Sequence, residues 1–239
     1  MKIFGLDSPL MQALSKVADL LWLNVLTLIC CLPIVTIGAS LTALNYMALK
    51  IARNEECYIT RGFFKSFREN FKQATIIWLS MLLLIVILVT DFIIMSGGTE
   101  TGFGKVLWGV IMAVALLVAA TMLYVFPVLA KFENTVFRTL KNALIMSLMQ
   151  FPKTLIMLVA YAVPPVLFFT VAQTMPLCIM FGLSVPAWIS AKLYNKFFKK
   201  LEDQVLAANP PAEQEGGPEE DERIFKDELD PVLADKDIT

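Results

Sequence analysis

The sequence predicts an all-α protein, a polytopic transmembrane helix bundle. We expect five long apolar segments forming six membrane segments, with an N-terminal helical hairpin, and then a disordered acidic C-terminal tail. Three observations predict this class. Of 239 residues, 57% are hydrophobic and 17% charged, whereas soluble domains have about 25% charged residues. Uncharged runs of membrane-spanning length recur along the chain. Residues 203–239 hold 12 acidic and 3 basic residues in a Pro- and Gly-rich context that cannot support a packed core.

The first apolar run, Leu20–Leu49, has thirty uncharged residues and is interrupted at LPIVTIG. Thirty helical residues would measure about 45 Å, and the hydrocarbon core of a bilayer is about 30 Å thick. A helix starting at Ser8 is expected to end before Pro33, and Thr36 is the predicted N-cap of a second helix. The candidate hinge residues are Pro33, Thr36 and Gly38. We favour this hairpin, and the alternative is one long kinked span with its N-terminus outside.

The later spans follow from three further uncharged runs, at 73–90, 106–130 and 154–191. The first run predicts a helix from about Ala74 to Met95, and the second predicts a helix over about 105–130. Pro127 is expected to kink or end that helix. The third run is long enough for two spans joined by a tight turn at AQTMP, and Pro164–Pro165 is expected to break the first of these spans.

The distribution of positive charge orients the bundle. Lysine and arginine gather in 50–72, in 131–153 and directly after the last run, whereas the connections at 96–105 and 172–176 hold a single lysine. Cytoplasmic loops carry an excess of basic residues. We therefore predict a membrane domain, 1–202, whose C-terminus is cytoplasmic, followed by a cytoplasmic tail, 203–239. In the hairpin arrangement the N-terminus is cytoplasmic too.

An amphipathic pattern stands out at RGFFKSFRENFKQ, Arg61–Gln73. Three aromatic residues and four basic residues each recur at helical spacings of three and four, forming two stripes on a helix. The candidate lipid-binding or partner-docking residues are Arg61, Phe64, Lys65, Phe67, Arg68, Phe71 and Lys72. We expect an in-plane interfacial helix on anionic lipid, with partner docking as the alternative. Nucleic acid is not an expected partner, because the segment directly precedes a span. A weaker version of the pattern occurs at Phe137–Lys153.

The chain offers little that suggests catalysis. It has no histidine, which is the commonest general base and metal ligand, and its four cysteines have no metal-site or redox spacing. Asp91 is the one carboxylate deep in a predicted span, and it is either an intramembrane polar site or a residue reaching the outer interface. We predict a protein that is not an enzyme, with no catalytic, cofactor-binding or metal-binding residues.

Three blocks of the sequence carry a family resemblance: LNVLTLICCLPIVTIGAS, FFKSFRENFKQA and YVFPVLAKFENTVFRTLKNALIMSL. Together they resemble the YesL-like family of bacterial integral membrane proteins, over roughly residues 5–202. The resemblance implies a bacterial cell membrane and a link to sugar import, but it implies no functional residues.

The sequence leaves two main functions open. The first is a non-enzymatic accessory component of carbohydrate uptake, with the lipid bilayer and transporter subunits as partners. The second is an independent small-molecule or ion transporter or channel, in which helix breaks and Asp91 would line a path. A membrane-embedded enzyme using carboxylates has no paired acidic residues within the spans to support it. The oligomeric state stays open.

Overall fold

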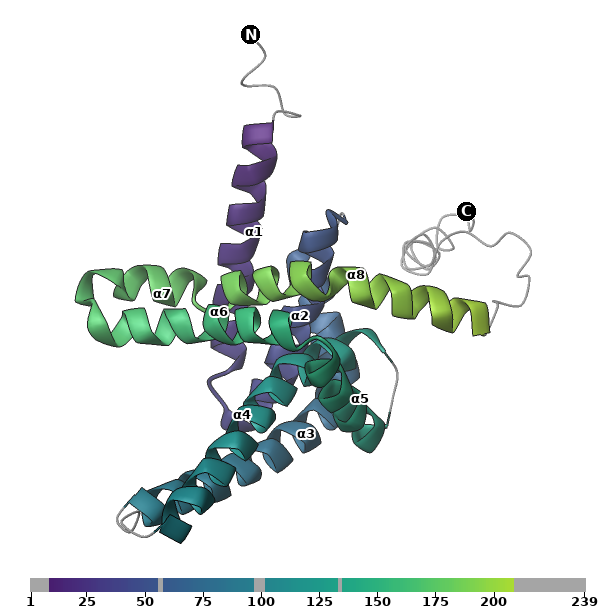
Figure 1. Cartoon of the computed structure of the whole chain (residues 1–239). Coiled ribbons are helices and arrows are strands. Elements are labelled where there is room, and N and C mark those ends of the chain that lie inside the picture. The colour runs from purple at the N-terminus through teal and green to yellow at the C-terminus, as the bar shows by residue number, and fades with distance from the viewer. Residues whose placement is uncertain (1–8, 56–57, 97–101, 133–134, 209–239) are drawn as a thin grey trace, which may run out of the picture. The chain divides into compact units, whose positions relative to one another are not determined.

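The computed structural model describes residues 9–55, 58–96, 102–132 and 135–208, and these residues are helical with short connections and no strand (Figure 1). The chain divides into two units, 1–196 and 197–239. Of the second unit, the structure describes only the last part of one helix, so the predicted disordered tail lies almost wholly outside the described residues. The all-helical fold class is confirmed.

The N-terminal run forms the predicted hairpin. Helix α1, Pro9–Cys30, ends three residues before Pro33, the short 3₁₀ helix η1 covers Ile34–Thr36, and α2 returns over Ile37–Arg53. Proline disfavours helix in the preceding residue, which explains why α1 stops there. The predicted cap at Ser8 lies outside the described residues.

The predicted role of Thr36 as a side-chain N-cap is wrong. Thr36 stands at the N-cap position of α2, but its side chain makes no cap hydrogen bond. Its hydroxyl instead donates to the carbonyl oxygens of Cys30, at 2.6 Å, and Pro33, at 2.8 Å. The Cys30 carbonyl is the last of α1, where backbone carbonyls have no donor within the helix, whereas the Pro33 carbonyl also accepts from the Thr36 backbone N–H at 3.1 Å. Thr36 therefore stabilises the end of α1 rather than the start of α2.

Helix α2 is largely buried and packs most extensively against α3, Ile59–Ser96. Its buried face is rich in small residues, and Gly38 lies directly against the backbone of α3. A methyl group at Gly38 would overlap the backbone oxygen of Ala74 and lie 2.7 Å from Cβ of Trp78. Small residues let helix backbones come close together in membrane proteins. Gly38 is thus a packing residue of the α2–α3 pair.

Helix α3 is longer than expected. Its 38 residues include both the amphipathic segment and the predicted span, without a break between them. At 1.5 Å per residue the helix measures about 57 Å, well beyond a hydrocarbon core of about 30 Å. Arg61–Gln73 is therefore not a separate helix but the first third of α3, and its place at the lipid interface stays a prediction.

The prolines of the next helices do not break them. Pro127 lies inside α4, Gly102–Lys131, which continues four residues beyond it. The second basic segment forms α5, Val136–Met149, and joins α6, Phe151–Thr170, at Gln150. The predicted break at Pro164–Pro165 is wrong, since α6 runs through both prolines. Neighbouring helices allow proline within membrane helices. The two prolines leave the carbonyls of Ala160 and Tyr161 without their usual helical donors, and nearby the Cys178 thiol of α7 donates to the Pro164 carbonyl at 3.5 Å.

The final span is broken instead. The predicted tight turn forms η2, Ala172–Thr174, and leads into a helix of seven residues, α7, Met175–Phe181. The chain bends by 50° before α8, Ser184–Ala208. The sequence predicts a single span here, so the break at Gly182 and Leu183 is a feature that it did not reveal.

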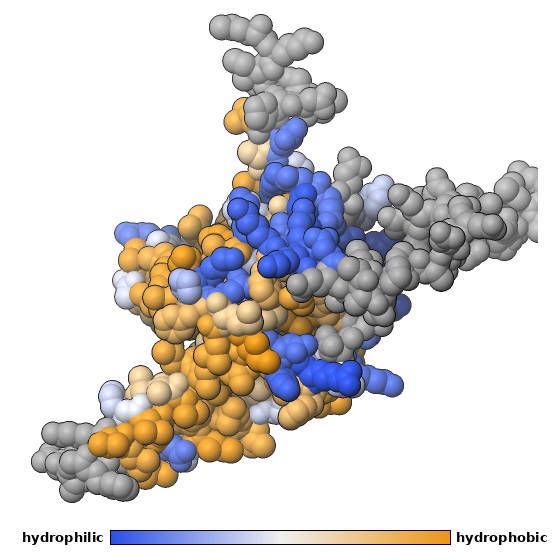
Figure 2. All heavy atoms as spheres, turned by 45° about the vertical axis from the view of Figure 1, so that its right-hand side comes forward, coloured by the Kyte–Doolittle hydropathy of each residue, from blue (hydrophilic) through white to orange (hydrophobic). Residues whose placement is uncertain are grey.

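Within the described residues, five helices are long and apolar enough to cross a membrane, and the bent pair α7–α8 brings the total to six. Large apolar side chains are exposed along α3, α4 and α6, including Leu83, Ile93, Val110 and Val159. Figure 2 shows this hydrophobic surface over α3 and α4. Exposed apolar surface of this extent marks contact with lipid or with other proteins. Together with the span lengths, it indicates a multi-pass membrane protein.

Candidate functional site

The first third of α3 has one buried face and one exposed face. Ile59, Phe63 and Ser66 are buried, and Phe63 has no exposed surface. Phe63 stacks on Phe67 with ring centroids 6.3 Å apart, and Phe67 contacts Phe71 with centroids at 5.5 Å. The aromatic residues therefore form a row along the inner side of α3, beginning at Phe63.

Phe64, which the sequence analysis placed in this row, lies elsewhere. Its side chain is 42% exposed and meets Phe63 edge to face, with centroids 5.6 Å apart. The adjacent pair Phe63 and Phe64 makes the choice ambiguous in the sequence, because residues one position apart point about 100° apart on a helix. Packing against α2 decides which of the two rings is buried. Gly62 lies against Met47 of α2, so closely that a methyl group added at Gly62 would be 2.7 Å from the Met47 sulfur.

The basic residues of the segment lie on the exposed side of α3, as the helical spacing predicts. All four are exposed and form one surface, which we call the basic stripe: Arg61, Lys65, Arg68 and Lys72. A helix with its opposite face buried against α2 holds these side chains on a rigid backbone. The structure thus brings the basic stripe together as one surface, with Phe64 beside it.

The break at Pro33–Gly38 is held closed by side chains of α3. The indole N–H of Trp78 donates to the carbonyl oxygen of Ile34 at 2.9 Å, and the Thr75 hydroxyl donates to that of Val35 at 3.3 Å. Backbone groups freed at a helix break need such partners where water is absent. The candidate hinge is therefore tied to α3 by two hydrogen bonds and by the close packing of Gly38.

The break between α7 and α8 is bridged by one side chain of α1. The Oδ1 atom of Asn24 accepts hydrogen bonds from the backbone N–H groups of Leu183 and Ser184, both at 2.9 Å. Its Nδ2 atom donates to the carbonyl oxygen of Ile179 at 2.7 Å. Asn24 is fully buried. Its one amide group therefore provides hydrogen-bond partners, away from water, for backbone groups at the start of α8 and near the end of α7.

Sequence reasoning missed Asn24. The signal was present, because Asn24 is a polar residue inside the uncharged run Leu20–Leu49, and buried polar groups in membrane helices seek partners. The partners, however, lie 155 or more positions further along the chain. No local pattern identifies them.

A second set of buried polar groups joins the inner helices. The hydroxyls of Tyr124 on α4 and Thr154 on α6 are 3.1 Å apart, and the Thr154 hydroxyl also lies 3.0 Å from the carbonyl oxygens of Ser147 and Gln150. These contacts hold α4 against the junction of α5 and α6. On α2, Arg53 donates from Nε to Oδ1 of Asn195 at 2.8 Å. The polar core therefore connects helices from both ends of the sequence.

Asp91 stands apart from these polar groups. Its side chain is exposed on α3, five residues before the helix ends at Ser96. The structure does not bring Asp91 together with the hinge residues or with the basic stripe. Across the described ranges, no group of three or more His, Cys, Asp or Glu side chains is arranged to hold a metal ion.

A protein-family model matches part of the chain. Residues 19–92 match the family described as "Protein of unknown function, DUF624". No curated protein matches the chain, and no solved structure does. The matched region contains most of α1, the hinge, α2 and nearly all of α3, and so it includes Asn24 and the basic stripe. Over this region the chain is similar to the DUF624 family, whose function is unknown.

Proposed function

We propose that this protein is a non-enzymatic accessory component of carbohydrate uptake in a bacterial cell membrane. The observation that supports it best is the basic stripe on the exposed side of α3. The sugar connection comes from the resemblance to the YesL-like family, which is linked to sugar import. The absence of histidine and of any catalytic pattern in the sequence agrees with a docking role.

The proposed orientation puts the basic stripe in the cytoplasm. The positive-inside rule favours cytoplasmic positions for 50–72 and 131–153, with both termini on that side. The first third of α3 then extends from the membrane toward the cytoplasm. It presents its basic side chains where the cytoplasmic subunits of an uptake system assemble.

The geometry suits docking because the stripe is preorganised. Binding costs free energy when flexible segments must become ordered, and a helix already packed along one face avoids most of that cost. Complementary charge mainly gives specificity and a faster association rate. We therefore propose an acidic surface on a transporter subunit as the partner of Lys65, Arg68 and Lys72.

The test is co-purification from mild detergent, followed by an uptake assay. The wild-type chain should co-purify with transporter subunits, and deletion of its gene should lower uptake of one class of sugar. The charge-reversal variant K65E/R68E/K72E should lose the subunits while keeping its elution volume and helicity. Reversal of Lys196, an exposed lysine on α8, is the matched control. Unchanged co-purification in the triple variant, or no transporter subunit with the wild type, would contradict the proposal.

An independent transporter is the second candidate, and the broken helix α7–α8 favours it. Transporters bind substrates and ions where membrane helices are interrupted. Here the interruption is satisfied by Asn24 of α1, so opening a path would require these hydrogen bonds to exchange for substrate or water. Purified protein in liposomes distinguishes the two functions: transport of a sugar or ion without any partner supports this second candidate and argues against an accessory role.

A further inference from the structure

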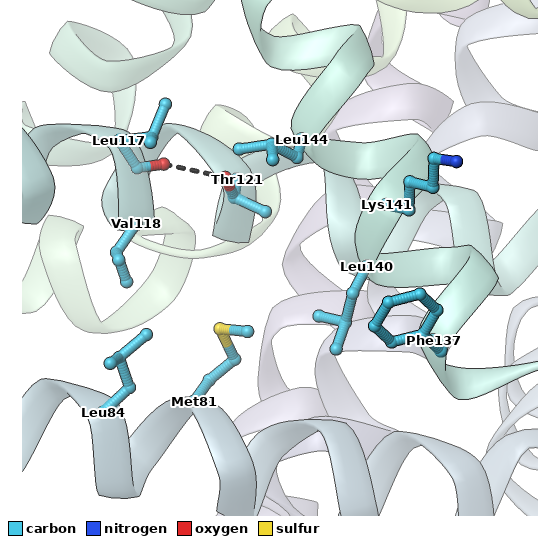
Figure 3. Close-up of a pocket in the computed structure, with 9 residues that line it drawn as sticks. All are labelled: Met81, Leu84, Leu117, Val118, Thr121, Phe137, Leu140, Lys141 and Leu144. Atoms are coloured by element: carbon cyan, nitrogen blue, oxygen red, sulfur yellow. Dashed lines mark hydrogen bonds between the residues drawn. The ribbon is translucent and has the colours of Figure 1, made fainter.

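A pocket of about 350 Å³ lies between α3, α4 and α5 (Figure 3). Leucine and methionine side chains from three helices form its walls, among them Met81, Leu84, Leu140 and Leu144. The Thr121 hydroxyl also reaches the wall, but it donates to the Leu117 carbonyl oxygen of its own helix at 2.7 Å. The walls therefore offer an apolar ligand a surface, and among the uncharged lining residues only the Thr121 hydroxyl oxygen could accept a hydrogen bond from a polar solute such as a sugar.

One charged side chain lines this pocket. The aliphatic stem of Lys141 belongs to the wall, and Figure 3 shows its ammonium group pointing away from the centre of the cavity. Arg138 is exposed one helical turn earlier on α5, so the two cations share one side of that helix. The site thus combines an apolar interior with positive charge at its edge.

The helices around the pocket have lipid-facing surfaces. Leu83 on α3, which is next to the lining residue Leu84, is 63% exposed. Phe137 on α5, which itself lines the pocket, is 77% exposed. An aliphatic chain from the bilayer can reach such a site without crossing water.

We propose that the pocket binds one acyl chain of an anionic phospholipid, whose phosphate pairs with Lys141. The apolar walls would hold the chain, and the ammonium group, with Arg138 beside it, would select a negative headgroup. A bound chain would fill the space that α5 leaves against α3 and α4. This binding site is independent of the proposed role in carbohydrate uptake.

Binding is tested on the full-length protein in detergent by native mass spectrometry. Phosphatidylglycerol and phosphatidylcholine with identical acyl chains are added in turn. We expect retained adducts to appear with phosphatidylglycerol at about one fifth of the concentration that phosphatidylcholine requires. One lysine near an anionic headgroup contributes about 1 kcal/mol, which corresponds to this factor. Lys141→Ala should remove this preference, whereas Lys196→Ala should keep it. Equal binding of the two lipids by the wild type would overturn the proposal.

The position of the chain is tested by filling the pocket. Leu84→Trp should abolish retained lipid adducts, and Leu83→Trp, an equally large change on the exposed side of α3, should leave them unchanged. Equal effects of the two substitutions would overturn the site. Photoactivatable phosphatidylglycerol on the wild type covers the case in which Leu84→Trp does not fold. The lipid should crosslink to Leu140 or Leu144, and crosslinks only to other residues would overturn the site. In a second experiment a photoreactive amino acid replaces Leu140, and crosslinks from it to a second copy of the chain would overturn the proposal as well.

Discussion

At the scale of single residues, polar side chains of one helix satisfy the broken backbone of another. Asn24 does this for α7 and α8, while Trp78 and Thr75 do it for the connection after α1. An unpaired backbone group buried in a protein costs about 1–3 kcal/mol of stability, and transfer of such a group from water to a fully apolar solvent costs more. Substitutions that remove these side-chain hydrogen bonds while keeping the side-chain size should therefore lower the stability of the protein.

Asn24→Leu should destabilise the protein strongly. The substitution leaves two N–H groups and one carbonyl group unpaired, and at about 1 kcal/mol for each group the loss is about 3 kcal/mol. The measurement is the midpoint of thermal unfolding in detergent. Thr90→Val is the control, because the Thr90 hydroxyl donates only to Val86 of its own helix on an exposed surface. A wild-type midpoint for Asn24→Leu would show that Asn24 does not bridge the break.

Phe63 and Phe64 form a second matched pair. Phe63→Ala removes a fully buried ring and should cost about 3–5 kcal/mol of unfolding free energy. Phe64→Ala, at a position 42% exposed, should cost less than about 1 kcal/mol. Urea or thermal unfolding of both variants in the same detergent decides between them. The reverse order would mean that the row begins at Phe64, as the sequence pattern suggested.

At the scale of elements, the pair α2–α3 is the main packing unit of the first half of the chain. Helix α2 contributes small residues, and α3 contributes the side chains that close the hinge. Apolar side chains gain little by leaving lipid for a helix contact, so close backbone approach and hydrogen bonds supply much of the stability. Gly38 supplies such a close approach, against the α3 backbone at Ala74.

Gly38→Ala should separate the effect of packing from that of helix propensity. Alanine favours helix over glycine by about 1 kcal/mol, but at position 38 its methyl group would overlap the Ala74 backbone, at an expected net cost of about 1–3 kcal/mol. Gly109→Ala on α4 meets nothing within 4 Å and should be neutral or slightly stabilising. Thermal unfolding of both variants is the measurement, and an unchanged or higher midpoint for Gly38→Ala would argue against tight α2–α3 packing.

At the scale of the whole molecule, the hairpin of α1 and α2 decides the predicted number of membrane crossings. With six crossings, counting α7–α8 as one, both ends of the chain would lie on one side of the membrane. The positive-inside rule predicts that this side is the cytoplasm. This topology therefore predicts that the N-terminus and the C-terminus are both cytoplasmic.

A cysteine introduced at position 2, in a chain whose four native cysteines are replaced, tests the topology. It should resist a membrane-impermeant thiol reagent in intact cells and react after the cells are opened, because the N-terminus is predicted to be cytoplasmic. A cysteine at position 98, in a predicted outer connection, is the matched control and should react in intact cells. Labelling of position 2 from outside would contradict the hairpin topology.

Part of the candidate site followed from local patterns. The spacing of Arg61, Lys65, Arg68 and Lys72 placed the basic stripe on one side of a helix, since helical periodicity depends only on the chain itself. The same periodicity did not select Phe63 over Phe64. That choice depended on which neighbour α3 meets, and the contact of Gly62 with Met47 on α2 settled it.

The sequence by itself determined the helical class and located the apolar segments, and it favoured the hairpin over one long kinked span. These properties follow from the length of uncharged runs measured against a bilayer and from Pro33, both local quantities. Only the tertiary structure decided the unbroken course of α4 and α6 through their prolines, the bend between α7 and α8, and the bridge made by Asn24. The physical reason is that a helix in an apolar environment breaks or continues according to whether another helix supplies partners for its freed backbone groups, and those partners come from distant parts of the chain.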